Sequence, residues 1–220
     1  MSYNKYTGND KALKEYIDRI DPSIVKKGFV FEACQRFADI VLSSVALVLS
    51  SPIMLITGVL IKLEDGGPIF YKQERMGRYG KEFYVYKLRS MRTDAEKFGA
   101  QWANKEDNRI TKIGKFIRKT RIDELPQLVN ILKGEMGIIG PRPERPIFVK
   151  EFEEKNPGFV QRLAVRPGLT GWAQVNGGYD ITPQEKLEYD LYYIKNRSIL
   201  LDIKIVLLTI KVVLTGDGAR

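Results

Sequence analysis

The chain has 220 residues, of which 44% are hydrophobic, and this length is enough for one domain with a sizeable core. Its 36 Lys and Arg residues against 27 Asp and Glu residues give a net charge of +9, which indicates an anionic partner such as nucleic acid, a phospholipid surface or a phosphorylated substrate. The absence of histidine and the single cysteine, Cys34, exclude imidazole catalysis, thiolate zinc sites and an internal disulfide, so catalysis must use Asp, Glu, Lys, Arg or Tyr and a metal must bind to oxygen.

A polar stretch of mixed charge comes first and contains one predicted helix, near Lys11–Ile20. The Asp21-Pro22 pair marks the end of this helix, because proline favours a turn and cannot continue the helix. We expect this stretch, residues 1–31, to form a peripheral extension.

The most apolar stretch is Phe37–Ile61, whose 25 residues carry one charge, that of Asp39. As a helix it is about 37 Å long, which is enough to cross a bilayer core of about 30 Å. It is longer than the apolar region of a signal peptide, and no small-residue cleavage site follows it. The sequence therefore predicts a membrane segment that stays in the mature protein.

The charges beside this segment argue against a simple crossing. Four Lys and Arg residues lie within 20 positions before it and five within 20 positions after it, so the two flanks are equally basic. Since basic flanks stay in the cytoplasm, both ends are expected there. Pro52 supplies a turning point by removing a helical hydrogen bond, at a cost of about 3 kcal/mol, and Ser50 and Ser51 can bind the freed carbonyls. A kinked spanning helix and a buried helix of a soluble protein stay open as alternatives.

After the apolar segment, two runs rich in aromatic and β-branched residues, Pro68–Gln73 and Glu82–Met91, flank a basic turn that contains glycine. This pattern predicts a β-hairpin. In the second strand, Lys87 and Arg89 share a face, because side chains alternate along a strand.

Two helices are predicted next. Arg109–Arg121 contains six basic residues and no acidic one, with isoleucines on one helical face and lysines on another, which is typical of a solvated face or of a helix at a membrane surface. A second helix is expected to begin at Asp123, a favoured N-cap, with Pro126 in its first turn and Gly134 after its end.

A second apolar stretch, Leu200–Leu214, contains three charged residues, Asp202, Lys204 and Lys211. It is too short and too charged to cross a bilayer. We expect a helix that packs on the domain or lies at the interface with its lysines extended toward water, and a buried strand is the alternative.

The adjacent acids Asp123 and Glu124 are the best candidates for chemistry. Near a helix start, the helix dipole keeps a carboxylate ionised and attracts phosphate. An ionised Asp can act as a nucleophile toward phosphorus or bind magnesium. The simpler alternative is that the pair only caps the helix.

Basic residues on both sides of this pair can together form a polyphosphate site, although each alone is more often a surface charge. They are Lys87, Arg89, Arg92, Arg118, Arg121, Arg142 and Arg145. The loop GIIGPRPERP frames Arg142 with glycines and prolines, which favour a rigid turn. A second loop, VRPGLTGWAQVNG, contains Trp172, Gln174 and Asn176. The aromatic ring of Trp172 can either stack on a base or pack within the protein.

Four blocks of the sequence, read in order, resemble the bacterial sugar transferase family: PIFYKQERMG, FYVYKLRSMR, RIDELPQLVNILKGEMGIIGPRP and RPGLTGWAQVNG. The likeness covers residues 32–215. These monotopic phosphoglycosyl transferases load a sugar 1-phosphate from a UDP-sugar onto polyprenyl phosphate and release UMP. The chain resembles their short form, which implies an α+β, mainly helical fold with a re-entrant membrane helix, interfacial amphipathic helices and a small β-hairpin.

The same resemblance implies roles for individual residues. Ser51 and Pro52 match the break in the family's re-entrant helix. Asp123 matches the nucleophile, which forms a covalent phosphosugar intermediate and binds Mg²⁺, and Glu124 either ligates the metal or orients Asp123. The basic positions of the family are matched by Lys87, Arg118 and Arg142, and Arg89 and Arg145 complete the phosphate site that the charges predict.

The implied partners are a UDP-sugar, undecaprenyl phosphate and the bilayer. Nucleic acid is not expected, because the basic residues border an apolar segment and no nucleic-acid-binding motif is present. The oligomeric state stays open, a homodimer included. The implied localisation is the cytoplasmic face of the bacterial inner membrane, in the first membrane step of glycan assembly.

The resemblance also suggests how the chain is divided. The expected division is an extension over residues 1–31 and a phosphoglycosyl transferase domain over residues 32–220, with its membrane segment at 37–61 and its cytoplasmic catalytic part at 62–220. Two other hypotheses compete with the covalent mechanism. In one, both substrates bind together and Asp123 only holds magnesium. In the other, the chain is a basic protein of the membrane surface whose binding falls steeply with salt and does not depend on Asp123.

Overall fold

A computed structural model describes residues 10–26, 28–97, 99, 107–177 and 181–215 of the chain. The fold is mainly helical with two small two-stranded sheets, which places it in the α+β class, as expected. Its α-helices are α1 (Lys11–Ile17), α2 (Phe29–Asp65), α3 (Lys112–Lys119), α4 (Gln127–Lys133), α5 (Pro146–Lys155), α6 (Trp172–Asn176), α7 (Pro183–Asn196) and α8 (Ile199–Thr215). Its strands are β1 (Phe70–Met76), β2 (Glu82–Leu88), β3 (Gly137–Ile139) and β4 (Gly168–Thr170). Short 3-10 turns are η1 (Pro22–Ile24), η2 (Arg78–Gly80), η3 (Ile122–Glu124) and η4 (Phe159–Ala164).

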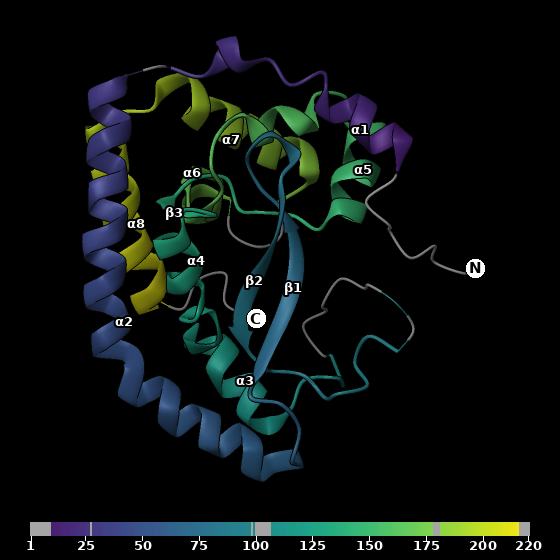
Figure 1. The fold of residues 1–220 in the computed structure, drawn as a ribbon, viewed down its shortest axis with the longest axis vertical. Helices are drawn as coiled ribbons and strands as arrows, with labels where there is room; N and C mark the ends of the chain where they lie inside the picture. Colours follow the sequence, from purple (N-terminus) through teal and green to yellow (C-terminus); the bar gives the residue numbers. More distant parts are fainter. Residues whose placement is uncertain (1–9, 27, 98, 100–106, 178–180, 216–220) are drawn as a thin grey trace.

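The longest element is α2, a helix of 37 residues that runs along the outside of the molecule (Figure 1). Within the described residues, it is the one helix whose length and composition would allow it to cross a membrane. Small and polar side chains face the protein, and large apolar ones face outward. The buried positions of α2 are Asp39, Ser43, Ser50, Thr57, Gly58 and Ile61. This arrangement is the reverse of that in a soluble helix, so the outer face of α2 is suited to lipid.

The helix α2 bends near its middle, and its two halves run in different directions (Figure 1). Pro52 lies inside the helix and has no N–H to donate to the carbonyl of Val48. The hydroxyl of Ser51 donates to that carbonyl over 2.8 Å, and the hydroxyl of Ser50 approaches the Leu47 carbonyl at 3.4 Å. Ser51 therefore supplies the expected compensation at the freed carbonyl, whereas Ser50 approaches a carbonyl that Pro52 does not free.

Both halves of α2 bind the same folded domain. In the first half, the Arg36 guanidinium donates to the carbonyls at the end of α4, and the Asp39 carboxylate accepts from the backbone N–H of Ile138 over 2.8 Å. In the second half, the Glu64 carboxylate accepts from the N–H of Lys112 over 2.7 Å, at the start of α3. The concave side of the bent helix thus holds the domain at both ends.

The predicted hairpin is confirmed. Strand β1 pairs with β2 in antiparallel register, from Phe70 opposite Leu88 to Met76 opposite Glu82. The first strand begins two residues later and ends three residues later than the sequence suggested, because pairing continues up to the turn η2. Tyr79 in this turn has a φ of 54°.

The basic helix is present as α3, shorter than predicted. Its Ile113 and Ile117 pack with Leu88 at the end of the hairpin, which leaves the lysine face outside. The start of the second helix is corrected: residues Ile122–Glu124 form the turn η3, and α4 begins only at Gln127. Gly134 ends α4 in the left-handed conformation, as its position predicted.

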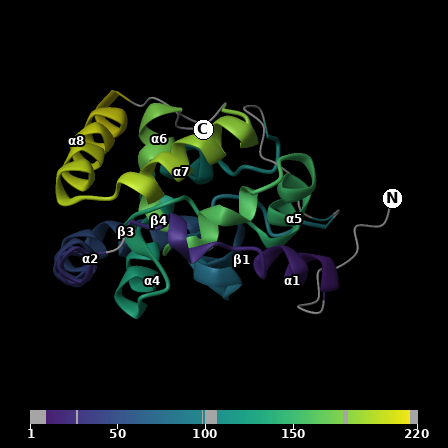
Figure 2. The same cartoon turned by 90° about the horizontal axis from the view of Figure 1, so that it is seen from above.

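The last apolar stretch forms a helix, α8, and not a buried strand. Ile205 is buried, whereas Leu200, Leu207 and Leu214 are exposed. In both views α8 lies on the same side of the molecule as α2 (Figures 1 and 2). The two most apolar helices therefore share one side of the fold.

Strands β3 and β4 form a parallel pair, in which β3 contacts α2 and β4 contacts α8. A Cβ on Gly168 would lie 2.0 Å from the backbone nitrogen of Gly140, so the two chains approach closely only because both residues are glycine. This close approach fixes the start of the loop that carries Arg142.

Residues 10–26 of the expected extension pack on the domain, while residues 1–9 lie outside the described part of the chain. Leu13 is fully buried in a cluster with Val149 and Val160. Asp10 forms an ion pair with Lys150 at 2.7 Å, and the backbone N–H of Lys26 donates to the carbonyl of Ile194. Residues 10–26 thus form a strap across the domain surface. The helix α2 begins at Phe29, within the residues 1–31 that were expected to form the extension.

Replacing Leu13 with Ala removes the buried anchor of this strap. We expect the substitution to destabilise the fold by about 2–5 kcal/mol, as is typical of Leu→Ala in a core. Thermal unfolding in neutral detergent micelles measures the loss, and Lys14→Ala, at an exposed neighbouring position, is the matched control. Equal melting temperatures for the two variants would mean that the strap contributes nothing to the stability of the domain.

Candidate functional site

Three segments far apart in sequence converge on the acid pair. Lys87 comes from the end of β2, Glu124 from the turn η3 and Arg142 from the loop after β3. The Lys87 ammonium donates to Glu124 Oε1 over 3.2 Å. The Arg142 guanidinium binds both oxygens of the same carboxylate, with Nη1 at 3.3 Å from Oε2 and Nη2 against Oε1. Glu124 therefore joins the hairpin to the loop.

Asp123 has a different environment. Its side chain is buried, with 8% of the residue exposed, and no hydrogen bond from any described residue reaches its carboxylate. Burial raises the pKa of Asp123 to about 6, while the positive charges of Lys87, Arg118 and Arg142 oppose the rise and Glu124 adds to it. At pH 7 and above the carboxylate is ionised and available.

Glu124 titrates in the opposite direction. Burial alone would raise its pKa, but the ion pairs with Arg142 and Lys87 outweigh burial and hold the pKa well below the usual range of a carboxyl. In return, the Glu124 carboxylate raises the pKa of Arg142. The two neighbouring acids are therefore distinct: Glu124 is a fixed anion, and Asp123 is the one with unused oxygen lone pairs.

The local backbone explains this separation. Arg121 has a φ of 58°, a left-handed conformation that turns the chain sharply before η3. The turn places both acids in a 3-10 segment, and the helix α4 that follows has no side-chain cap. The capping alternative for Asp123 is therefore wrong.

The other predicted basic residues divide between this site and other places. Arg118, in the last turn of α3, contributes positive potential at Asp123. Arg145 lies at the start of α5, and its Nη1 donates to Glu96 over 2.9 Å. Arg89 is a correction: it is buried and bound to Asp65 and the Pro68 carbonyl, because it follows the last residue of β2 and turns toward the end of α2. It stabilises that junction and does not face the acid pair.

The loop candidates lie apart from the acid pair. Trp172 stacks on Tyr192 with ring centroids 5.5 Å apart, and the Lys204 ammonium lies over its ring. The Asn176 side chain donates to the carbonyl of Trp172, within its own helix. Both polar atoms of the Gln174 side chain are buried without a hydrogen-bond partner among the described residues. Trp172 and Asn176 are thus engaged in contacts within the protein, and the buried donor and acceptor of Gln174 have no partner among the described residues.

A buried network of charges supports the Arg142 loop and was missed in the sequence. Arg162 Nε donates to Asp190 over 2.6 Å, and Arg162 Nη2 donates to the carbonyl of Arg142 over 3.0 Å. Arg75 Nη1 donates to the carbonyl of Pro143 over 2.9 Å. The remaining members of the network are Glu144, which pairs with Arg75, and Lys186, which pairs with Glu144. The sequence signal that could have indicated this network is Arg162, a charged residue among the mostly apolar residues of FVQRLAV.

The site offers few ligands for a metal. Within the described ranges, no group of three or more Asp, Glu, Cys or His side chains is placed to hold an ion. Magnesium is usually bound by one or two carboxylates together with substrate phosphates, so a single unbonded carboxylate fits this mode. Asp123 has free oxygens for it, and those of Glu124 are engaged by Lys87 and Arg142.

Comparison with known proteins gives close relatives. A protein from Aeromonas hydrophila, named UDP-N-acetylgalactosamine-undecaprenyl-phosphate N-acetylgalactosaminephosphotransferase, is 49% identical over 194 residues, which are 87% of this chain and 46% of the relative. A protein from Xanthomonas campestris pv. campestris, named UDP-glucose:undecaprenyl-phosphate glucose-1-phosphate transferase, is 42% identical over 81% of this chain and 38% of the relative. The chain therefore spans less than half the length of these two relatives.

A third relative is similar in length. It is the Bacillus subtilis (strain 168) protein named sugar transferase EpsL, which has no characterised function and is 40% identical over 84% of this chain and 90% of the relative. The family model described as bacterial sugar transferase matches residues 30–216, which include the bent helix, the hairpin, the acid pair and the Arg142 loop. The chain belongs to the bacterial sugar transferase family.

Proposed function

We propose that the chain transfers a sugar 1-phosphate from a UDP-sugar to undecaprenyl phosphate and releases UMP. The observation that carries this proposal is the contrast between the two acids. Asp123 is ionised at neutral pH and accepts no hydrogen bond from the described residues, while Glu124 is fixed between Lys87 and Arg142. The names of the relatives support the acceptor, and two of them support a UDP-sugar donor.

The first step is attack by a carboxylate oxygen of Asp123 on the β-phosphorus of the UDP-sugar. The bond between that phosphorus and the bridging oxygen breaks, and UMP leaves with the bridging oxygen. An acyl phosphate that carries the sugar stays on Asp123. A phosphate oxygen of the lipid then attacks the same phosphorus, the bond to Asp123 breaks, and the product is the polyprenyl diphosphosugar. One phosphoanhydride replaces another, so the overall reaction needs no external energy source.

The surrounding residues make the first step feasible by neutralising charge. A carboxylate that approaches a diphosphate meets repulsion, and Lys87, Arg118 and Arg142 supply positive potential at that place. The network of Arg162 and Arg75 holds the backbone of the Arg142 loop, so that the guanidinium does not need to be ordered when substrate binds.

Magnesium is the cofactor that we propose for this site, with Asp123 and the substrate phosphates as its ligands. The ion would supply further neutralisation of the diphosphate. Full turnover in the presence of EDTA would contradict this assignment.

We further propose that α2 enters the cytoplasmic leaflet and returns to the same side. A straight helix of this length would measure about 56 Å and separate its two ends by more than the bilayer core. Hydrogen bonds of Arg36 and Asp39 near one end and of Glu64 near the other attach both ends to one domain, which argues for a single side. The bend near Pro52 supports the same topology (Figure 1).

Replacing Asp123 with Asn tests the nucleophile. The amide cannot form an acyl phosphate, so we expect no UMP release in a single turnover and no radiolabelled adduct after incubation with a labelled UDP-sugar alone. Asp202→Asn is the control, because Asp202 is also a carboxyl group whose pKa is raised by partial burial but lies in α8. An Asp123→Asn variant that still forms product from both substrates would instead favour direct attack by the lipid, with Asp123 as a metal ligand.

The pKa of Asp123 predicts a pH dependence of the first step. The pKa is raised to about 6, so the carboxylate becomes neutral as the pH falls through this value, and the nucleophile is lost at lower pH. We expect the single-turnover rate constant for UMP release without acceptor to fall about tenfold per pH unit below a midpoint at pH 6 or lower, since bound metal favours the ionised form. Omitting the acceptor removes the titration of the lipid phosphate from the profile. A rate that stays constant from pH 7 down to pH 4 would exclude a titrating carboxylate.

Replacing Pro52 with Leu restores a helical hydrogen bond and favours a straight α2. We expect part of the population to adopt a spanning form, with the residues before α2 outside the cytoplasm. Single cysteines at Ser23 and Lys81, in a Cys34→Ser background, report the side by labelling of intact cells with an impermeant thiol reagent. Both positions should be protected in the parent and in the Ile53→Leu control, and the Ser23 position should be labelled in the Pro52→Leu variant. Labelling of Ser23 in the parent would rule out re-entry.

A further inference from the structure

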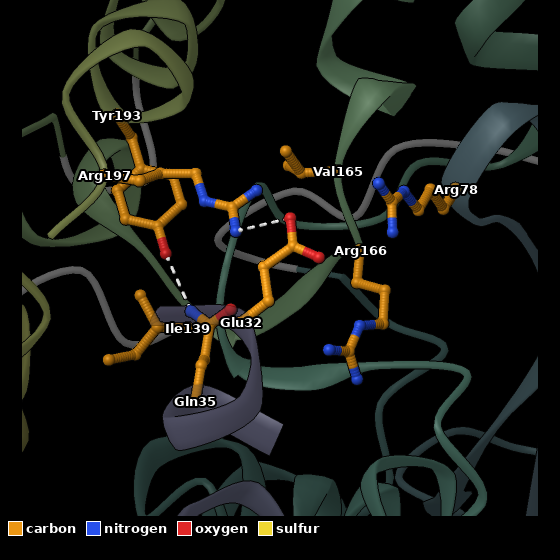
Figure 3. A pocket seen from close by; sticks show the side chains of 8 residues that line it. All are labelled: Glu32, Gln35, Arg78, Ile139, Val165, Arg166, Tyr193 and Arg197. Carbon is orange, nitrogen blue, oxygen red and sulfur yellow. Dashed lines mark hydrogen bonds and ion pairs between the residues drawn. The ribbon is translucent and has the colours of Figure 1, made fainter. Parts of the chain in front are cut away.

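A second cationic pocket lies at the start of α2, and none of the residues that bind the acid pair lines it. Its walls include Glu32 and Gln35 of α2, Arg78 of the hairpin turn, Arg166 before β4 and Arg197 before α8. Figure 3 shows the Glu32 carboxylate between the Arg197 guanidinium on one side and those of Arg78 and Arg166 on the other. The four charged groups therefore face one common space.

The positive charges in this pocket exceed the negative ones. Three guanidinium groups line the pocket, against the carboxylate of Glu32. Arg197 reaches Glu32 at 3.5 Å, and Arg166 reaches Asp39 at 3.8 Å, a distance too long for a hydrogen bond. Buried or half-buried arginines are rarely left in excess, because each guanidinium carries five donors.

Several of those donors are unused. In the described part of the chain, no hydrogen bond from the Arg166 guanidinium is found, and the buried Nε of Arg197 has no partner. Arg78 uses Nε on the carbonyl of Ala164 at 3.3 Å and Nη2 on the Tyr79 hydroxyl, which leaves Nη1 without a partner. A tetrahedral oxyanion would satisfy this set of donors, since guanidinium groups bind phosphate through paired N–H donors.

The position of the pocket suggests the source of such an anion. The first residues of α2 next to it, Phe29 and Val30, are 89% and 70% exposed. At the start of α8, just after Arg197, Leu200 is 80% exposed. Arginines beside exposed apolar side chains at the start of two membrane-facing helices lie at the depth of lipid headgroups.

We propose that this pocket binds a phosphate group at the membrane surface, supplied by the headgroup of an anionic phospholipid. The anion would enter beside Glu32 and bind Arg166 and Arg78, while Arg197 keeps its ion pair. Such a contact would fix the depth of the first half of α2 relative to the headgroups, and this role is separate from substrate binding. The measurement below needs no nucleotide sugar, so failure of the proposed reaction would leave its outcome unchanged.

The test is native mass spectrometry of the full chain in neutral detergent micelles, titrated with phosphatidylglycerol in one arm and inorganic phosphate in the other. We expect saturable binding of one phosphatidylglycerol by the parent. Arg166→Gln should weaken this binding about tenfold, since it removes a charge-assisted contact. Glu32→Gln should strengthen it, because the variant removes the competing carboxylate.

Arg19→Gln is the matched control, because it removes an exposed guanidinium that lies outside the pocket, over the ring of Tyr16. Its affinity should equal that of the parent. Equal binding of inorganic phosphate, with the same responses to Arg166→Gln and Glu32→Gln, would support the pocket and identify free phosphate as a second source. Equal affinities of the parent, Arg166→Gln and Glu32→Gln for both probes would overturn the proposal. The opposite signs expected for the two variants distinguish a binding site from a general loss of fold.

Discussion

The ion pairs of Glu124 with Lys87 and Arg142 are the interaction on which the rest of the site depends. They join a strand end, a 3-10 turn and a loop after another strand, which no backbone pairing connects. Because Glu124 forms the ion pairs with Lys87 and Arg142, the buried Asp123 beside it is ionised only above about pH 6 and accepts no hydrogen bond within the described ranges. A substitution that removes one charged residue of this arrangement leaves its partner buried without an opposite charge. The resulting loss of folding stability is larger than the net stabilisation that the ion pair provides.

The inward face of α2 is complementary to the domain that packs on it. The inward stripe of α2 is small and polar, so that the domain can approach the helix and bind it through Asp39 and Glu64. Its outward face is apolar and is matched by α8 on the same side of the molecule (Figure 2). The Asp123 carboxylate belongs to the turn between α3 and α4, and both of these helices contact α2. The acid pair therefore lies close to the apolar helix in space, as the proposed reaction between a lipid phosphate and a nucleotide sugar requires.

Local patterns in the sequence predicted the hairpin, the basic helix, the apolar helices and the acid pair, because each depends on neighbouring residues. Contacts between distant segments could not be predicted in this way. Arg89 lies one residue beyond the end of β2, where the alternation of side chains along the strand no longer applies. Its side chain therefore forms an ion pair with Asp65 and does not share a face with Lys87. The pairing of Arg162 with Asp190 and the burial of Leu13 depend on segments that periodicity cannot relate.

The strap formed by residues 10–26 has a consequence for the order of folding. On the ribosome these residues emerge before the domain on which they pack: Leu13 packs on Val149 and Val160, and the backbone N–H of Lys26 donates to the carbonyl of Ile194. The strap therefore cannot reach its native position until nearly the whole domain has been synthesised, and α2 is complete before either of its flanks has a partner. A segment that is translated before the domain is therefore among the last to reach its native position.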